Sequence, residues 1–321
     1  MNRKIKFSEI FGGNVGDKPT FQGEGKFTGV PSVWVRFFGC NFECRGFGQK
    51  NPADPSTYEF NYPDFDFSKI KSMEEVPMIT TGCDSAYSWS SKFKHLAPDG
   101  TAEEVVALLE AKLNGANFIH PKSGQDCHLV FTGGEPMLPG HQQSMADILK
   151  VFYEKKNWPL NITIETNATK KPVKAFEDCF NPRSYFYIKD EVVDPSVPKK
   201  DLPDYVPWKL FWSCSPKLYT SGEKWENAIK PEVVKEYASI SNHGQLKYVC
   251  DGTDRCWDEV QRANDMYRDV GVFWPTWIMP VGADLEQQER NSAAISDEAL
   301  RRGYNVASRV HCFVYGNQMG R

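Results

Sequence analysis

The sequence predicts an α/β fold in which parallel strands form a partial, open βα barrel with helices on the outside. Short runs of β-branched and aromatic residues alternate with longer amphipathic segments along most of the 321 residues. Strand–helix–strand repetition implies parallel pairing through right-handed crossovers. Seven strands are predicted, and a closed barrel of this kind needs eight. The barrel is therefore expected to stay open.

The predicted strands are short apolar runs without internal breakers, and they are 32–38, 128–131, 161–166, 209–214, 245–250, 275–280 and 309–315. The predicted helices have apolar residues at helical spacing, and they are 101–113, 143–156, 226–240, 255–270 and 286–302. The first of these helices begins with a Thr cap and two acidic residues, a typical start signal.

Two regions interrupt this alternation within an otherwise single predicted domain, 1–321. Residues 45–82 are rich in Phe, Tyr, Asp and Pro and are interpreted as an insertion. Residues 190–208 contain four prolines and are predicted to form a long surface loop. The aromatic content of the first region is compatible with binding a reductase, covering a site or mediating dimerisation.

Composition sets limits on function. A net charge of −4 offers no electrostatic basis for wrapping nucleic acid. No run approaches the ~18 apolar residues that span a bilayer, and the first residues lack the apolar core of a signal peptide. We therefore expect a cytoplasmic protein without membrane or direct nucleic-acid contact. Nine cysteines, an odd number, favour metal ligation by a subset over a disulfide framework.

Three cysteines are candidate ligands of a soft metal or an iron–sulfur cluster. Cys40 and Cys44 directly follow strand 32–38, and Cys83 stands in a Cys-Asp-Ser segment after the insertion. Spacing alone leaves open that the first two are core residues one helical turn apart. The other cysteines are interpreted as packing residues: Cys127, Cys179, Cys214, Cys250, Cys256 and Cys312.

A second motif follows the next strand. Strand 128–131 runs into Thr132-Gly133-Gly134-Glu135-Pro136. Paired glycines let a ligand approach the backbone closely, and Glu135 can accept hydrogen bonds from an ammonium group. A plain strand-to-helix turn would look the same, but ligands of α/β sheets bind beyond the carboxyl ends of strands. The two motifs together predict a site at that edge.

With these residues the chain resembles the radical S-adenosylmethionine (SAM) enzymes, and among them the 7-carboxy-7-deazaguanine synthase family of the 7-deazapurine (queuosine) pathway. The matching segments occur in the family's order and are Gln22-Gly23-Glu24-Gly25, Gly29-x-Pro31-Ser32, Val35-Arg36-Phe37-Phe38-Gly39-Cys40-Asn41, Cys83-Asp84-Ser85 with Tyr87 and Trp89, Glu165-Thr166-Asn167, Ser215-Pro216-Lys217, Met279-Pro280, and Arg309-x-His311 with Gly316-Asn317. The chain departs from the pattern at Phe47, where the family has its third cysteine, and Cys83 is taken as the displaced equivalent.

The resemblance implies a reaction and its cofactors. A radical SAM lyase of this family converts 6-carboxy-5,6,7,8-tetrahydropterin to 7-carboxy-7-deazaguanine and ammonia by radical ring contraction. It uses a [4Fe–4S] cluster, SAM and Mg2+, and it acts as a homodimer with a flavodoxin-like reductant. The product feeds modification of tRNA or of DNA, and these residues do not distinguish the two.

Site residues are carried over only where the motifs match. The implied cluster ligands are Cys40, Cys44 and Cys83, and Ser85 is the implied Mg2+ ligand. The implied SAM-binding residues are Gly133, Gly134, Glu135, Thr166, Ser215 and Lys217. The implied substrate-binding residues are Phe21, Gln22, Gly23, Glu24, Arg36, Thr132 and His311, of which Glu24 and Arg36 are also implied in catalysis.

Bland interpretations stand beside several of these residues. Lys217 fits a solvated lysine, Arg36 a structural ion pair, His311 a core histidine and Ser85 an ordinary turn. Another radical SAM enzyme, such as a glycyl-radical activase, shares the cysteines and the Gly-Gly-Glu-Pro motif. A zinc-binding protein without catalysis would need only the cysteines.

Overall fold

The computed structural model describes residues 3–60, 66–181, 206–316, 318 and 320. Its strands are β1 Ile5–Gly12, β2 Ser32–Phe37, β3 Asp99–Gly100, β4 His128–Gly133, β5 Asn161–Thr166, β6 Lys209–Cys214, β7 Gly244–Cys250, β8 Thr276–Pro280 and β9 Asn305–Val306. Its α-helices are α1 Ala102–Glu110, α2 Pro139–Glu154, α3 Lys174–Asp178, α5 Trp225–Ala228, α6 Pro231–Ile240, α7 Asp254–Asp269, α8 Leu285–Arg301 and α9 Val310–Tyr315. The predicted loop 190–208 lies outside the described residues except for 206–208.

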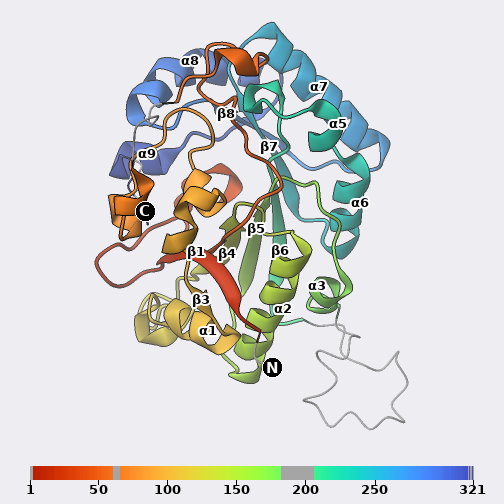
Figure 1. Cartoon of the computed structure of the whole chain (residues 1–321). Helices are drawn as coiled ribbons and strands as arrows, with labels where there is room; N and C mark the ends of the chain where they lie inside the picture. The colour runs from red at the N-terminus through yellow and green to blue at the C-terminus, as the bar shows by residue number, and fades with distance from the viewer. Residues whose placement is uncertain (1–2, 61–65, 182–205, 317, 319, 321) are drawn as a thin grey trace.

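The strands form one open sheet in the order β3-β1-β2-β4-β5-β6-β7-β8-β9. From β2 to β9 every neighbouring pair is parallel, and strands that follow one another in this run lie side by side. The helices lie around the outside of the curved sheet (Figure 1). The prediction of an α/β fold with an open, mainly parallel sheet is confirmed.

Local signals explain several element boundaries. Thr101 and Glu104 form a capping box at the start of α1, and Thr253 caps α7. Pro231 divides the predicted helix 226–240 into α5 and α6, because its ring is suited to a first helical turn and not to a helix interior. The core lies between sheet and helices, where the Trp212 and Tyr237 rings stack at 4.1 Å.

One predicted strand is wrong. Residues 309–315 were expected to be β because of their Val, Phe and Tyr content, but residues 310–315 form helix α9. The Val310 N–H donates to the Gly23 carbonyl and the Arg309 side chain is held by Glu24, so this segment closes over the strand ends instead of joining the sheet. Gly316, with φ 62°, ends the helix in the left-handed region. The last strand is β9, a two-residue segment before it.

Strand β1 was not predicted. It pairs antiparallel with β2 and carries Glu9 opposite Arg36. An added antiparallel strand beside a parallel sheet is common in mixed sheets. Such a strand is not part of a strand–helix–strand repeat, so that pattern does not predict it.

The insertion 45–82 has an apolar cluster of its own. Phe67, Ile70, Val76 and Ile79 pack with side chains from the segment that follows, including Phe93, apart from the main core. Between Asp54 and Val76 the described part consists of short 3-10 turns joined by extended chain. The insertion therefore returns the chain to the sheet edge through a satellite core.

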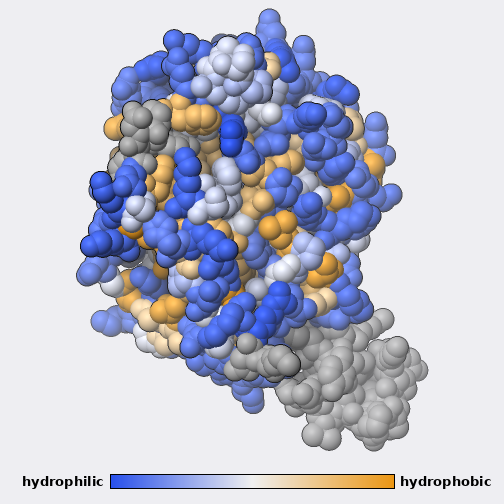
Figure 2. All heavy atoms as spheres, viewed as in Figure 1, coloured by the Kyte–Doolittle hydropathy of each residue, from blue (hydrophilic) through white to orange (hydrophobic). Residues whose placement is uncertain are grey.

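The viewed face of the molecule is mostly hydrophilic, with hydrophobic residues between the polar ones mainly toward its middle (Figure 2). None of the helices within the described residues has both the length and the apolar character required to cross a membrane.

Candidate functional site

A cavity of about 620 Å³ opens at the carboxyl ends of the parallel strands. Residues just beyond β2, β4, β5, β6 and β8 line it, together with the loop before β2, part of the insertion and α9. Parallel strands end at a common edge, so loops far apart in sequence converge there. This is where the sequence placed the site.

Nearly all of the predicted site residues line this one cavity. They are Phe21, Gln22, Gly23, Glu24, Arg36, Cys40, Cys44, Cys83, Ser85, Thr132, Gly133, Gly134, Thr166, Ser215, Lys217 and His311. Glu135 is the predicted residue that does not line it.

The three candidate cysteines form one wall of the cavity. Cys40, Cys44 and Cys83 pack in a single small cluster that also contains Phe42 and Phe47. Burial raises the pKa of the Cys40 thiol to about 12, with Glu135 and Cys83 adding to the effect. Burial also raises the pKa values of Cys44 and Cys83, whereas the Lys217 ammonium opposes the rise at all three thiols.

Backbone contacts hold this wall in place. Glu223 Oε1 accepts hydrogen bonds from the backbone N–H groups of Glu43 and Cys44, at 3.0 and 2.8 Å. A Cβ on Gly134 would lie 2.2 Å from the Gly39 carbonyl oxygen and 2.8 Å from Cys40 Cβ. Only glycine allows the β4 loop to approach the first cysteine this closely.

Glu135 joins two strand ends beneath the cavity. Its carboxylate is fully buried and accepts hydrogen bonds from Thr166 Oγ1 at 2.6 Å, Asn167 N at 2.7 Å and Met137 N at 2.8 Å. Thr166 lines the cavity and Glu135 does not. In this arrangement Glu135 positions Thr166 and its neighbours, and the expected direct contact with SAM would need these hydrogen bonds to rearrange.

Fixed charges line another part of the cavity wall. Glu24 pairs with Lys247 on β7 and with Arg309, whose Nε lies 3.0 Å from Glu24 Oε1. Arg309 also pairs with Asp84 at 2.8 Å. Burial alone would raise the pKa of Glu24, but Lys247 and Arg309 together hold it well below its usual range. Glu24 is therefore ionised at neutral pH.

The loop that carries Glu24 packs closely against the carboxyl ends of the strands and against α9. Gln22 Nε2 donates to Glu165 Oε1 at 2.8 Å, and its Oε1 accepts from the Glu24 N–H. A Cβ on Gly23 would lie 2.0 Å from His311 Nδ1, so a larger residue would displace that ring. Burial, and then Arg309, lower the pKa of His311 to about 4, which leaves the imidazole neutral at pH 7.

Arg36 lies beside the charged wall and is itself paired. Its Nε lies 2.8 Å from Glu9 Oε1, and its guanidinium lies over the rings of Phe11 and Tyr87. Burial alone would lower the pKa of Arg36, but Tyr87 and Glu9 raise it above its usual range. The ion pair with Glu9 uses one of its five donors, so Arg36 keeps capacity to bind an anion.

Ser85 and the Ser215–Lys217 pair supply further polar atoms. Ser85 Oγ donates to Asp84 Oδ1 at 3.2 Å, which places a hydroxyl and a carboxylate side by side on the cavity wall. Lys217 Nζ donates to Ser215 Oγ at 3.1 Å. Lys217 therefore has a defined position on the cavity wall, unlike a solvated lysine.

Four residues that shape the site were missed as functional candidates: Lys247, Arg309, Glu9, and Asp84 of the matched Cys-Asp-Ser segment. Lys247 sits inside a predicted buried strand, where a lysine is rare unless paired, and that signal could have identified it. Arg309 appeared in a matched motif without a role. Glu9 gave no signal because its strand was not predicted.

Known proteins resemble this chain at low identity. No family model matches it. A 7-carboxy-7-deazaguanine synthase of Rhodopirellula baltica is 24% identical over 303 residues, covering 93% of this chain and 84% of its own. Those named alike from Pyrobaculum aerophilum and Bacillus subtilis are 22% and 24% identical, covering 99% and 63% of this chain and 98% and 56% of their own. The chain thus bears a distant resemblance to 7-carboxy-7-deazaguanine synthases.

Proposed function

We propose that this protein is a 7-carboxy-7-deazaguanine synthase, a radical SAM lyase that converts 6-carboxy-5,6,7,8-tetrahydropterin to 7-carboxy-7-deazaguanine and ammonia. One observation carries the proposal: the wall of a single cavity has three cysteine thiols in one part and an ordered set of charges in another. A zinc-binding structural protein would need the first part and not the second.

The donor set fits an iron–sulfur cluster. Three thiols packed together, two of them from a loop fixed by Glu223, are the ligands that such clusters use. Cys40, Cys44 and Cys83 would hold the cluster, and a three-cysteine set leaves one iron for SAM. When bound, cluster and SAM supply a one-electron reduction and a radical able to remove hydrogen from the substrate.

The strand ends next to the thiols fit the polar part of SAM. Gly133 and Gly134 bring backbone close to Cys40, and Thr166, Ser215 and Lys217 add hydroxyl and ammonium groups on the same wall. Glu135 holds Thr166 from below. These residues would bind and orient the amino and carboxylate groups of SAM without moving a proton.

The charged part of the wall fits the pterin. An ionised Glu24 accepts hydrogen bonds from the amino and ring N–H groups, and Lys247 and Arg309 keep it ionised. Arg36 is the partner for the substrate carboxylate, because its guanidinium is held by Glu9 and two rings. A neutral His311 has one nitrogen that donates and one that accepts, and Phe21, Gln22 and Thr132 complete the enclosure.

Ser85 and Asp84 fit a hard cation. Their oxygen atoms adjoin on the cavity wall, and Mg2+ takes few protein ligands and keeps water or substrate oxygens. In this proposal Ser85 holds the ion against the substrate carboxylate. A flavodoxin-like protein is the proposed reductant and a homodimer the proposed assembly.

The test is anaerobic reconstitution with iron and sulfide, followed by a reduced assay with SAM, Mg2+ and 6-carboxytetrahydropterin, read by mass spectrometry. Formation of 7-carboxy-7-deazaguanine and ammonia supports the proposal. Cleavage of SAM without that product would keep the cofactors and reject the substrate. A colourless protein that binds zinc at these cysteines and no iron would reject the proposal outright.

A further inference from the structure

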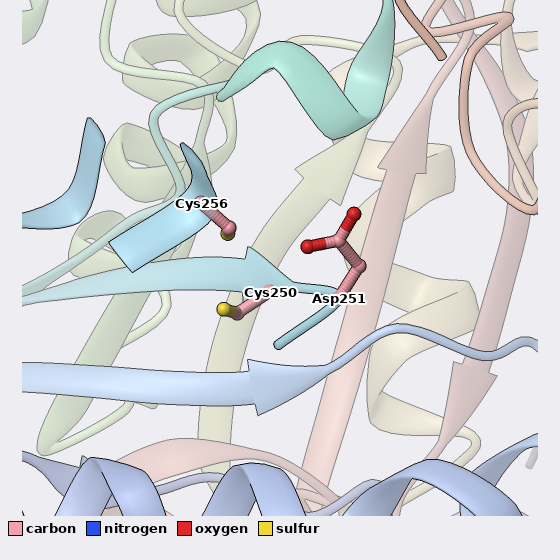
Figure 3. A group of neighbouring side chains, drawn as sticks. All are labelled: Cys250, Asp251 and Cys256. Atoms are coloured by element: carbon pink, nitrogen blue, oxygen red, sulfur yellow. The ribbon is translucent and has the colours of Figure 1, made fainter. Parts of the chain in front are cut away.

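A second group of metal-ligating side chains lies behind the sheet. Within the described residues, Cys250, Asp251 and Cys256 form the group of three Cys, His, Asp or Glu side chains whose ligand atoms lie within 4.8 Å of one another. Cys250 is the last residue of β7, Cys256 lies in the first turn of α7, and Asp251 directly follows the strand (Figure 3). The sequence analysis interpreted both cysteines as packing residues.

This group is separate from the main cavity. Side chains alternate along a strand, and on β7 Lys247 and Val249 line the main cavity. Cys250 therefore faces the other side of the sheet, where it packs with Cys256 in the main core. Both sulfur-bearing side chains are fully buried, whereas Asp251 is half-buried.

Hydrogen bonds from neighbouring residues orient Asp251 and Cys250, as hydrogen bonds to metal ligands commonly do. Asp251 Oδ1 accepts hydrogen bonds from Thr253 N at 3.1 Å and Thr253 Oγ1 at 2.8 Å, and the Tyr219 hydroxyl donates to Oδ2. The Gly252 N–H donates to Cys250 Sγ at 3.4 Å. Such contacts fix ligand geometry and stabilise a thiolate.

A smaller cavity of about 200 Å³ reaches Asp251 of this group. Asp251 lines it together with Gly48 and Pro52 of the insertion, and with Arg290 and Asn291 of α8. This smaller cavity adjoins the main one, with which it shares Gly48, Val281, Gly282 and Gln287. An ion and a water molecule can therefore reach the Asp251 carboxylate, although none of the three candidate ligands lines the main cavity.

We propose that Cys250, Asp251 and Cys256 bind a zinc ion, with water as the fourth ligand. Two thiolates, a carboxylate and water match the tetrahedral preference of Zn2+, whose bonds to sulfur are about 2.3 Å long. Binding releases the two thiol protons to solvent and transfers no electrons. A bound ion would tie the end of β7 to the start of α7 beside the insertion.

The experiment measures zinc and iron together in the full chain, purified anaerobically and dialysed against zinc. Wild type is expected to hold one zinc per chain at this site, and Cys250→Ser and Cys256→Ser to lose that equivalent with iron content unchanged. Cys127→Ser, which alters another buried thiol, is the matched control and keeps the zinc. Equal zinc in all four proteins, or none in wild type, would overturn the proposal.

Tyr219→Phe covers the case in which a serine variant fails to fold. It removes the hydroxyl that donates to Asp251 and leaves all three ligands in place. Loss of such an outer contact is expected to weaken zinc affinity by about ten- to a hundredfold. Zinc affinity equal to that of wild type would contradict the proposed ligand set.

Discussion

Two groups of cysteines in this molecule differ in how the chain assembles them. Cys250 and Cys256 are six positions apart and meet across a strand end and a helix start. Cys40 and Cys83 are brought together by an insertion with an apolar cluster of its own. The first group is held by the main core, and the second depends on a satellite core.

This difference indicates that a site formed by loop residues resists local unfolding no better than those loops do. Local openings cost least where few apolar contacts hold a segment. The thiols at the cavity should therefore respond to damage in the insertion, and the pair behind β7 should not. The predictions below test that separation.

The largest expected effect is that of Cys83→Ala. Loss of one of the three proposed cluster ligands should abolish cluster assembly and activity, measured as iron per chain and product formed. Cys256→Ala is the comparison variant and should keep its iron. Full iron and activity in Cys83→Ala would show that the insertion does not return a ligand to the cavity.

Glu24→Gln should spare the iron and impair turnover by about a hundredfold or more. The change removes the charge that is proposed to receive the substrate's N–H groups, and it leaves Lys247 with a neutral partner. Turnover under saturating substrate and iron content are the two measurements. Glu226→Gln, an exposed carboxylate, is the matched control. Parallel loss of iron and turnover would mean that the two parts of the cavity wall are not independent.

Phe93→Ala should destabilise the insertion by about 3–5 kcal/mol, because Phe93 is buried in the satellite core. The expected result is faster local hydrogen exchange over the insertion and weaker retention of iron. Val260→Ala removes a buried side chain of α7 in the main core and serves as the control. If both variants retain iron equally, the satellite core does not support the cysteine wall.

The smallest expected effect concerns His311 and pH. Its folded pKa of about 4 lies below the ordinary value near 6.5, so the unfolded chain binds a proton more readily. Its contribution to stability is present above about pH 6.5 and is lost as pH falls toward 4. His311→Asn should reduce this pH dependence by up to about 3 kcal/mol, measured by denaturation of the substrate-free protein between pH 7 and 4. If the free energy of unfolding of both proteins depends on pH in the same way, the His311 side chain is exposed to solvent and its pKa is not lowered.

Much of the fold followed from local pattern. Six of the strands between residues 32 and 280 and the longer helices between them were predicted within a few residues, because alternation, helical spacing and caps are properties of short segments. The short strand β3 and the short helix α3 were not predicted. The position of the cavity followed as well, since parallel strands bring their carboxyl ends to one edge. The candidate residues came from motifs placed at those ends.

Only the tertiary structure decided which charged side chains pair with one another. The sequence did not show that Lys247 and Arg309 would both pair with Glu24, or that Glu9 would hold Arg36. It predicted a strand at 309–315, where contacts with Gly23 and Glu24 favour a helix. A residue's pattern reports its own burial and backbone preference, whereas charge pairing depends on which distant segment folds against it, and that depends on the packing of the whole chain.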